Sequence, residues 1–461
     1  MHRKVRSDMT EGKTLGKIIL FALPLMLSGI LQLLYNAADL VVVGQFASST
    51  SMGAVGACSS LINLIVGACL GLSIGAGISA SHDVGSGAHK RLSRLIHTSL
   101  LTGFLSGLLV GILGFLASRA LLVMMKTPAE ILPEAVLYMR AYFVGVPAAM
   151  VYNFLAAILR SSGDSKRPFI FLAVSGFINV ILNLVMVLGF GLGAVGVGIA
   201  TAASQYAAAI MAIVYMMRHK GICHIDLQAC RIDKGELARI FRMGIPSGIQ
   251  SMCFSLSNVV LQSSVNLFGD VAVEGNSAAA NIAGFIYIVV YSFAQTATVF
   301  AGQNLGAGRL DRLNRILGEC ALCTAVSGLL VGMLSVVFAH PLLSLYAPGN
   351  EAAIAVGILH LKMVAPPYFI YGIMAVGAGM MQGMGRPVLP MVINLVGTCV
   401  LRLIWVAGLG LLVPGYEKDP SNIQLLYLCY PVSWSCTLVA QYIAYFSAKR
   451  KMERGLACTK A

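Results

Sequence analysis

Charged residues are scarce in this chain of 461 amino acids: Asp, Glu, Lys and Arg together make up 11%, against about 25% in an ordinary soluble domain. Hydrophobic residues make up 58%, and the mean hydropathy is +0.83. Because so few charges could not cover the surface of a soluble protein, we expect most of this protein's surface to be in contact with lipid. The 11 Cys residues do not indicate a disulfide framework, because most lie inside apolar runs, where Cys acts as a small hydrophobic residue.

The sequence also lacks the motifs of several enzyme classes. It has no GxxxxGK[ST] phosphate loop, no HExxH zinc motif and no paired Asp within a hydrophobic run. Its single CxxC, formed by Cys320 and Cys323, has no second pair, so we expect neither a metal site nor a cofactor. A membrane-embedded enzyme is the least supported class, since catalysis would need several convergent groups.

Long apolar runs account for most of the chain. A search for stretches of about 20 apolar residues gives twelve expected membrane spans. They cover residues 16–44, 53–80, 95–118, 136–159, 168–189, 193–217, 238–267, 275–301, 316–339, 355–381, 388–413 and 423–447. The sequence therefore predicts an all-α integral membrane protein with twelve transmembrane helices.

Basic residues are distributed unevenly between the two ends of these spans. With twelve spans, both termini and every even-numbered connection lie on one side, and 26 of the 32 Lys and Arg residues fall there. Because short cytoplasmic connections are enriched in Lys and Arg, we expect a multi-pass protein of the cytoplasmic (inner) membrane with both termini in the cytoplasm. The net charge of +14 then requires no nucleic-acid partner.

The two halves of the sequence resemble each other at a spacing of about 222 residues. Matched pairs are Pro24 with Pro246, Asn36 with Asn258, Phe46 with Phe268 and Gly53 with Gly275. We expect an N-terminal six-helix bundle over 1–217, a cytoplasmic linker over 218–236 and a C-terminal six-helix bundle over 237–461. An even number of spans per half makes the repeats parallel, as in known transporters, and two similar bundles suit alternating access.

Asp39 is the only acid deep within a predicted span. An ionisable residue placed there costs several kcal/mol, so a functional role is the first interpretation. Spacings of 4, 3 and 4 place a polar stripe on one face of this helix. The stripe consists of Ser28, Gln32, Tyr35 and Asp39.

The fifth span offers a second polar face, because Asn179 and Asn183 lie one helical turn apart. Both features also have structural interpretations: Asp39 could be a hydrogen-bonded carboxyl that holds helices together, and the Asn pair could make interhelical hydrogen bonds. Pro24 removes a helical hydrogen bond inside the first span. A charge-sensitive hinge and a static kink both fit this proline.

From about residue 10 to 450 the chain resembles the multidrug and toxic compound extrusion (MATE) transporters. The resemblance lies in the segments ALPLMLSGILQLLYNAADLVVVGQF (22–46), LRSSGDSKRP (159–168), NVILN (179–183), NLGAG (304–308) and MQGMGRPVLP (381–390). It implies two six-helix bundles in a V shape and the exchange of H⁺ or Na⁺ for organic, often cationic, drugs.

The resemblance also implies a cation-coupling site in the N-terminal bundle, with Pro24 at the bending proline. The residues that match this site are Asp39, Tyr35, Asn179, Asn183 and Thr201. The NorM-like branch has acids in its seventh and tenth helices, where this chain has Phe254 and Tyr371. The pattern is therefore closer to the DinF-like branch, which makes a second cation site in the C-terminal bundle less expected and favours H⁺ without excluding Na⁺.

We therefore expect a secondary antiporter that exports amphipathic organic cations in exchange for protons through Asp39. Asn179 and Asn183 would act as orienting or relay groups. We expect the protein to function as a monomer in the lipid bilayer. Tyr35 would hydrogen-bond the carboxyl. Candidate substrate contacts are Gln32 and a polar-aromatic face in the eighth span formed by Tyr287, Tyr291 and Gln295.

The alternative of similar architecture is a flippase for a lipid-linked intermediate. Such flippases often have a strongly cationic cavity, whereas Arg402 is the only base deep in a predicted span here. We expect Arg402 to pair within the C-terminal bundle or to snorkel to the membrane surface.

Overall fold

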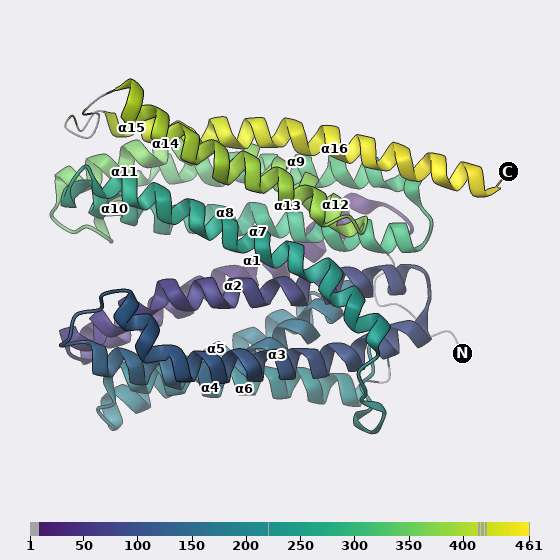
Figure 1. Cartoon of the computed structure of the whole chain (residues 1–461), viewed down its shortest axis with the longest axis horizontal. Helices are drawn as coiled ribbons and strands as arrows, with labels where there is room; N and C mark the ends of the chain where they lie inside the picture. The colour runs from purple at the N-terminus through teal and green to yellow at the C-terminus, as the bar shows by residue number, and fades with distance from the viewer. Residues whose placement is uncertain (1–8, 220, 414, 416–418, 420–421, 461) are drawn as a thin grey trace. The chain divides into compact units, whose positions relative to one another are not determined.

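The computed structural model describes residues 9–219, 221–413, 415, 419 and 422–460, and this part of the chain is built from helices (Figure 1). Within it, ten helices are long and apolar enough to cross a membrane, and a bent helix pair makes an eleventh span if it is counted as one. The prediction of an all-α membrane protein is confirmed.

Each predicted span coincides with one helix or with a short series of helices. In the first half these are α1 Thr14–Phe46, α2 Ser49–Gly85, α3 His89–Met124, α4 Leu132–Ser161, α5 Lys166–Leu184 with a π-helical turn Val185–Gly189, and α6 Gly193–Arg218. In the second half they are α7 Lys234–Asn266, α8 Asp270–Gly306, α9 Leu313–Val337 with α10 Ala339–Ser344, α11 Glu351–Val364 with α12 Tyr368–Gly383, α13 Val388–Asn394 with a π-helical segment Leu395–Val400 and α14 Leu401–Leu412, and α15 Ile423–Tyr427 with α16 Cys429–Lys460.

Two of the predicted spans differ from a simple apolar helix. Helix α7 is 33 residues long but too polar to be among the ten or eleven spans above. The span expected over 355–381 is broken between α11 and α12, which meet at an angle of 50°. Pro366 and Pro367 fall at this break, because proline has no N–H to continue the helical bonds and disfavours the helical conformation of the residue before it.

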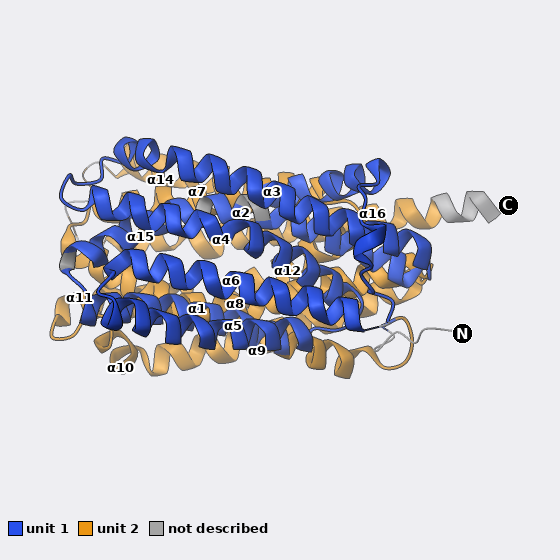
Figure 2. Ribbon diagram, turned by 90° about the horizontal axis from the view of Figure 1, so that it is seen from below, with its two compact units in different colours: residues 1–9, 24–248 blue, residues 10–23, 249–461 orange. Residues whose placement is uncertain are grey.

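The chain divides into two compact units, coloured in Figure 2. Unit 1 holds residues 1–9 and 24–248, and unit 2 holds residues 10–23 and 249–461. Of the three boundaries, one follows Met9, one falls inside α1 at Pro24, and one falls inside α7, two residues beyond Pro246. Helices α1 and α7 therefore each begin in one unit and end in the other, whereas the predicted bundles follow one another along the sequence.

Unit 1 is packed around α4, which contacts α2, α3 and α6. Small residues allow these helices to approach closely: a Cβ atom on Gly107 of α3 would lie 2.7 Å from the Cα of Pro147. The first half of α7 packs against α2 in the same way, since a Cβ on Gly75 would lie 2.7 Å from the Cα of Gly244. Glycine contacts thus hold the beginning of α7 within unit 1.

Unit 2 is packed around α8 and α12. The start of α1 belongs to it through two contacts. The ring of Phe21 lies edge-on to that of Phe300 in α8, with centroids 6.0 Å apart, and Arg312 donates to the carbonyl of Gly12 at 2.9 Å. Phe300 is completely buried, so this edge-on pair anchors the first turns of α1 in the core of unit 2.

Candidate functional site

Asp39 lies in the second half of α1, within unit 1, and its carboxylate accepts a hydrogen bond from the side-chain amide of Asn183 at 2.5 Å. The same amide nitrogen lies 3.2 Å from the side-chain oxygen of Asn179, one turn earlier in α5. Asn179 in turn donates to the hydroxyl of Thr201 in α6 at 3.4 Å. Four of the residues expected at the cation site therefore form one hydrogen-bonded chain across three helices.

Burial makes this series of hydrogen bonds rigid at the side chains that α5 contributes. Asn183 is 0% exposed and Asn179 5% exposed, whereas Asp39 is only partly buried. Buried amides cannot exchange their partners for water, so their hydrogen bonds persist. The carboxylate consequently stands at the accessible end of a fixed polar chain.

Tyr35 lies one turn before Asp39, and its hydroxyl donates to the main-chain carbonyl of Ala173 in α5 at 3.2 Å. This bond differs from the one to the Asp39 carboxyl that we expected. Gly176 makes the approach feasible, because a Cβ atom at this position would overlap the Tyr35 ring. Tyr35 thus fixes the separation of α1 and α5 beside the carboxylate.

No Lys, Arg or His among the described residues forms an ion pair with Asp39. Nor do any three His, Cys, Asp or Glu side chains in the described part of the chain come together as a metal site would require. A partly buried carboxylate with an amide donor and no basic partner can bind a proton or a small monovalent cation.

Pro24 lies fifteen residues before Asp39, at the point where α1 passes from unit 2 to unit 1. Its carbonyl accepts a hydrogen bond from the Ser28 hydroxyl at 2.7 Å. Gln32, the next residue of the predicted stripe, is exposed.

The other predicted substrate residues lie on α8 in unit 2. Tyr287 and Tyr291 stack with ring centroids 5.3 Å apart and planes inclined by 11°, and Gln295 is partly buried one turn further on. Tyr287 also packs against Phe254 and Tyr371, at 6.2 Å and 5.7 Å. The two positions at which the NorM-like branch has acids are therefore occupied here by rings that contact one another.

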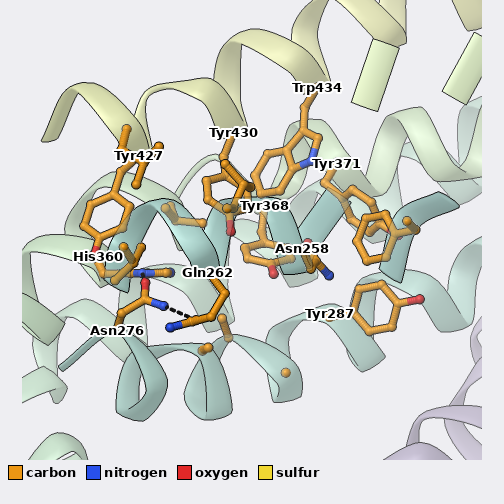
Figure 3. A pocket seen from close by; sticks show the side chains of 18 residues that line it. Asn258, Gln262, Asn276, Tyr287, His360, Tyr368, Tyr371, Tyr427, Tyr430 and Trp434 are labelled. Carbon is orange, nitrogen blue, oxygen red and sulfur yellow. Dashed lines mark hydrogen bonds between the residues drawn. The ribbon is translucent and has the colours of Figure 1, made fainter. Parts of the chain in front are cut away.

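Unit 2 also holds a cavity that the sequence did not indicate (Figure 3). Its wall includes Tyr427, Tyr430 and Trp434 from α15 and α16, with His360 from α11. The spacing of 3 and 4 between the first three residues was a signal that they share a helical face. His360 gave no such signal, because its neighbours in space come from other helices.

Arg402 is 2% exposed and lies within unit 2. Its Nε donates to Ser433 at 3.1 Å, one terminal nitrogen donates to Ser257 at 3.4 Å, and the guanidinium lies 4.6 Å from the centre of the Tyr430 ring. Of the two placements that we expected for this base, the structure has the one within its own bundle, where its contacts are two hydroxyls and a ring.

Comparison with known proteins agrees with this architecture. The MatE family model matches residues 24–185 and 246–406, so that its two matches begin at the paired prolines Pro24 and Pro246. Among curated proteins, the probable multidrug resistance protein YpnP of Bacillus subtilis (strain 168) is 30% identical over 398 residues, covering 86% of this chain and 88% of YpnP. The multidrug export protein MepA of Staphylococcus aureus (strain NCTC 8325 / PS 47) is 22% identical over 368 residues, covering 79% and 81%.

Solved structures show the same fold at low sequence identity. An outward-facing multidrug resistance MATE family transporter of the MOP superfamily superposes with a TM-score of 0.89 at 18% identity, covering 98% of this chain and 100% of that one. A MOP superfamily transporter from Pyrococcus furiosus Vc1 superposes with a TM-score of 0.90 at 18% identity, covering 98% and 99%. With the family model matched in both halves, the chain belongs to the MatE family of membrane transporters and is not an enzyme.

Proposed function

We propose that this protein is a secondary multidrug efflux antiporter that exports amphipathic organic cations across the cytoplasmic membrane in exchange for protons. The observation that carries the proposal is the hydrogen-bonded chain from Asp39 through Asn183 and Asn179 to Thr201. Relatives named as multidrug resistance and multidrug export proteins support the substrate class.

In the proposed cycle, Asp39 carries the proton. The charged carboxylate accepts the Asn183 amide hydrogen bond, and Asn179 and Thr201 keep that amide oriented. Protonation removes the negative charge and lowers the affinity of the bundle for a cation, so that proton binding and drug release are coupled. Exchange of one proton for one monovalent organic cation moves no net charge, so the pH gradient supplies the driving force, about 1.4 kcal/mol for each ten-fold difference in proton concentration.

Several finer features belong to the same proposal. Pro24 acts as the hinge of α1, and substrate contacts come from Gln32 and from the α8 face of Tyr287, Tyr291 and Gln295. Both termini lie in the cytoplasm, because most Lys and Arg residues fall on that side. The protein functions as a monomer and belongs with the DinF-like branch, with Na⁺ coupling as the nearest variant.

The test uses proteoliposomes loaded with the cationic dye ethidium. A pH gradient and a Na⁺ gradient are each imposed alone on wild type, on Asp39→Asn and on a matched control, Asp311→Asn, which alters an acid that is 66% exposed. We expect the pH gradient to drive dye movement in wild type and in the control, and Asp39→Asn to abolish it at equal amounts of folded protein.

Other outcomes have distinct meanings. Equal dye movement by Asp39→Asn and wild type would make Asp39 structural and contradict the proposal. Dye movement driven by the Na⁺ gradient but not by the pH gradient would show that the coupling ion is Na⁺ and not H⁺. Translocation of a labelled lipid without any dye movement would support the flippase.

A further inference from the structure

The cavity in unit 2 has a volume of about 310 Å³ and takes no part in the coupling chemistry proposed at Asp39. Its walls come from six helices: α7, α8, α11, α12, α15 and α16. Small-molecule sites in proteins typically occupy about 300–1,000 Å³, so the cavity is large enough for a compact organic ligand.

Aromatic rings form one wall of this cavity (Figure 3). Trp434 lies 5.0 Å from Tyr368 and 5.5 Å from Tyr371, measured between ring centroids. Tyr371 continues the wall to Tyr287 at 5.7 Å. Tyr287 lines this cavity, so its ring is assigned to the ligand of the cavity, and the proposed cation contacts are then Gln32, Tyr291 and Gln295. Rings at these separations and inclinations offer faces and edges against which a planar aromatic molecule packs favourably.

Uncharged polar groups line the other end of the cavity. His360, which is 4% exposed, lies with Nδ1 2.8 Å from the side-chain oxygen of Asn276. Asn276 donates through its amide nitrogen to Gln262 at 2.9 Å, so its oxygen faces His360, and Nδ1 is assigned as the donor in that bond. In this tautomer Nε2 of His360 is an acceptor that a ligand N–H or O–H can reach.

The charges around the cavity disfavour a cation. No Asp or Glu is present among the residues that line it in the described part of the chain. Arg402 lies behind the wall, with its guanidinium 4.6 Å from the centre of the Tyr430 ring, and within the described part of the chain it contacts two hydroxyls and this ring but no carboxylate. A buried positive charge without a counter-ion repels a second one more strongly than it would in water.

We propose that this cavity is a second small-molecule site, which binds uncharged planar aromatic compounds that carry a hydrogen-bond donor. The rings of Trp434, Tyr371 and Tyr368 hold the plane of the ligand, His360 accepts the donor, and Arg402 excludes organic cations. The inference goes beyond the proposed cation antiport and does not depend on Asp39.

Two three-ring probes of similar shape test the charge preference on the purified full-length protein in detergent. 1-Aminoanthracene is uncharged at neutral pH, and proflavine is a cation. The chain has two Trp residues, Trp405 and Trp434, so a Trp405→Phe background leaves the cavity residue Trp434 as the only donor for energy transfer to bound 1-aminoanthracene. Proflavine affinity is obtained by competition.

We expect 1-aminoanthracene to quench Trp434 saturably and to bind at least about ten-fold more tightly than proflavine. Equal or tighter binding of proflavine would overturn the proposal. Asp39→Asn should leave 1-aminoanthracene binding unchanged, which separates this site from the coupling site.

A pair of α8 variants localises the binding. Ala280 lines the cavity, whereas Ser277, three residues earlier and exposed, does not. Ala280→Phe should fill the space and weaken 1-aminoanthracene binding about ten-fold or more, while Ser277→Phe should change it less than about two-fold. Equal effects of the two variants, or no effect of Ala280→Phe, would place the probe outside the cavity and overturn the proposal.

The role of Arg402 has its own test. Arg402→Met removes the charge and keeps most of the side-chain volume, so proflavine affinity should rise about ten-fold. Thermal unfolding of this variant confirms that the protein is folded. If the Arg402→Met protein is folded and its proflavine affinity is unchanged, the claim that Arg402 excludes organic cations from the cavity is contradicted.

Discussion

Asn183 donates a hydrogen bond to Asp39 from a side chain that is itself completely inaccessible to solvent. The two residues are 144 positions apart in the sequence, and the bond joins α5 to α1 within unit 1. Since Asn179 lies against the same amide, the direction of the donor is fixed before any cation or proton arrives. The carboxylate is therefore preorganised for its ligand.

Asn183→Leu should uncouple transport from the pH gradient without removing the acid. Leu has a similar volume but no donor, and a hydrogen bond to a charged group contributes about 1.5–3 kcal/mol, so the coupled transport rate should fall about ten-fold or more. Dye efflux from proteoliposomes measures this. Asn281→Leu is the control, because Asn281 is exposed and donates within its own helix to the carbonyl of Ser277; similar losses in both variants would contradict a specific role for Asn183.

Gly176→Ala should destabilise unit 1, because the new methyl group would overlap the ring of Tyr35. Overpacking of this kind costs about 1–3 kcal/mol, and we expect a lower thermal unfolding midpoint in detergent. Tyr35→Ser removes the ring, so adding Gly176→Ala to the Tyr35→Ser protein should lower the midpoint much less than Gly176→Ala lowers it in wild type. A Gly176→Ala protein as stable as wild type would show that the ring can move away freely.

Arg239→Met should be among the most destabilising single changes in unit 1. Arg239 donates to both carboxylate oxygens of Asp83, at 2.8 and 2.9 Å, and to Glu236 at 3.3 Å, and the two acids are 2% and 4% exposed. Removing one partner of a buried ion pair costs about 3–5 kcal/mol.

The matched control for this substitution is Arg309→Met, which breaks an exposed pair with Asp311. Exposed pairs contribute little, so its thermal midpoint should stay near that of wild type. Equal midpoints for the two variants would contradict the structural importance of the Arg239 pairs.

Asp233 precedes α7 and should give unit 1 a pH-dependent stability. The main-chain N–H groups of Glu236 and Gly235 donate to its carboxylate and hold its pKa below the ordinary value. A lowered folded-state pKa means that the stabilisation is fully present above the unfolded pKa of about 3.9 and is lost as the pH falls through the lowered value.

Asp233→Asn isolates this effect, because Asn is an equally good helix cap that does not titrate in this range. We expect wild type to unfold at a higher temperature than Asp233→Asn at pH 7, and the difference to shrink as the pH is lowered towards 3. A difference that does not depend on pH would show that the charge of Asp233 is irrelevant.

The apolar runs were sufficient to locate the helices, because in lipid every span must satisfy its own backbone hydrogen bonds and is therefore a helix. The four-residue spacing of Asn179 and Asn183 likewise predicted that both would face the same way, and they contact each other. That spacing could not reveal which helix they face, which depends on the packing of α1 against α5 through Gly176 and Tyr35.

The cavity in unit 2 shows what local patterns do not contain. The polar end of the cavity is formed by His360, Asn276 and Gln262, which lie on three helices and are up to about a hundred residues apart in the sequence. Each alone resembles an ordinary polar residue in a membrane helix. The bend between α11 and α12 was readable from Pro366 and Pro367, yet the apolar run across them concealed it.

The exchange of helix beginnings has a consequence for the origin of the repeat. The first turns of α1 pack in unit 2 through Phe21, and the first half of α7 packs in unit 1 through Gly244 and Arg239. In a protein made of one six-helix half, the beginning of the first helix would have no surface within its own chain to pack against. It would have to pack against a second copy of the chain. An ancestral half-length chain of this architecture would therefore be a domain-swapped dimer, and gene fusion would have made the swap permanent.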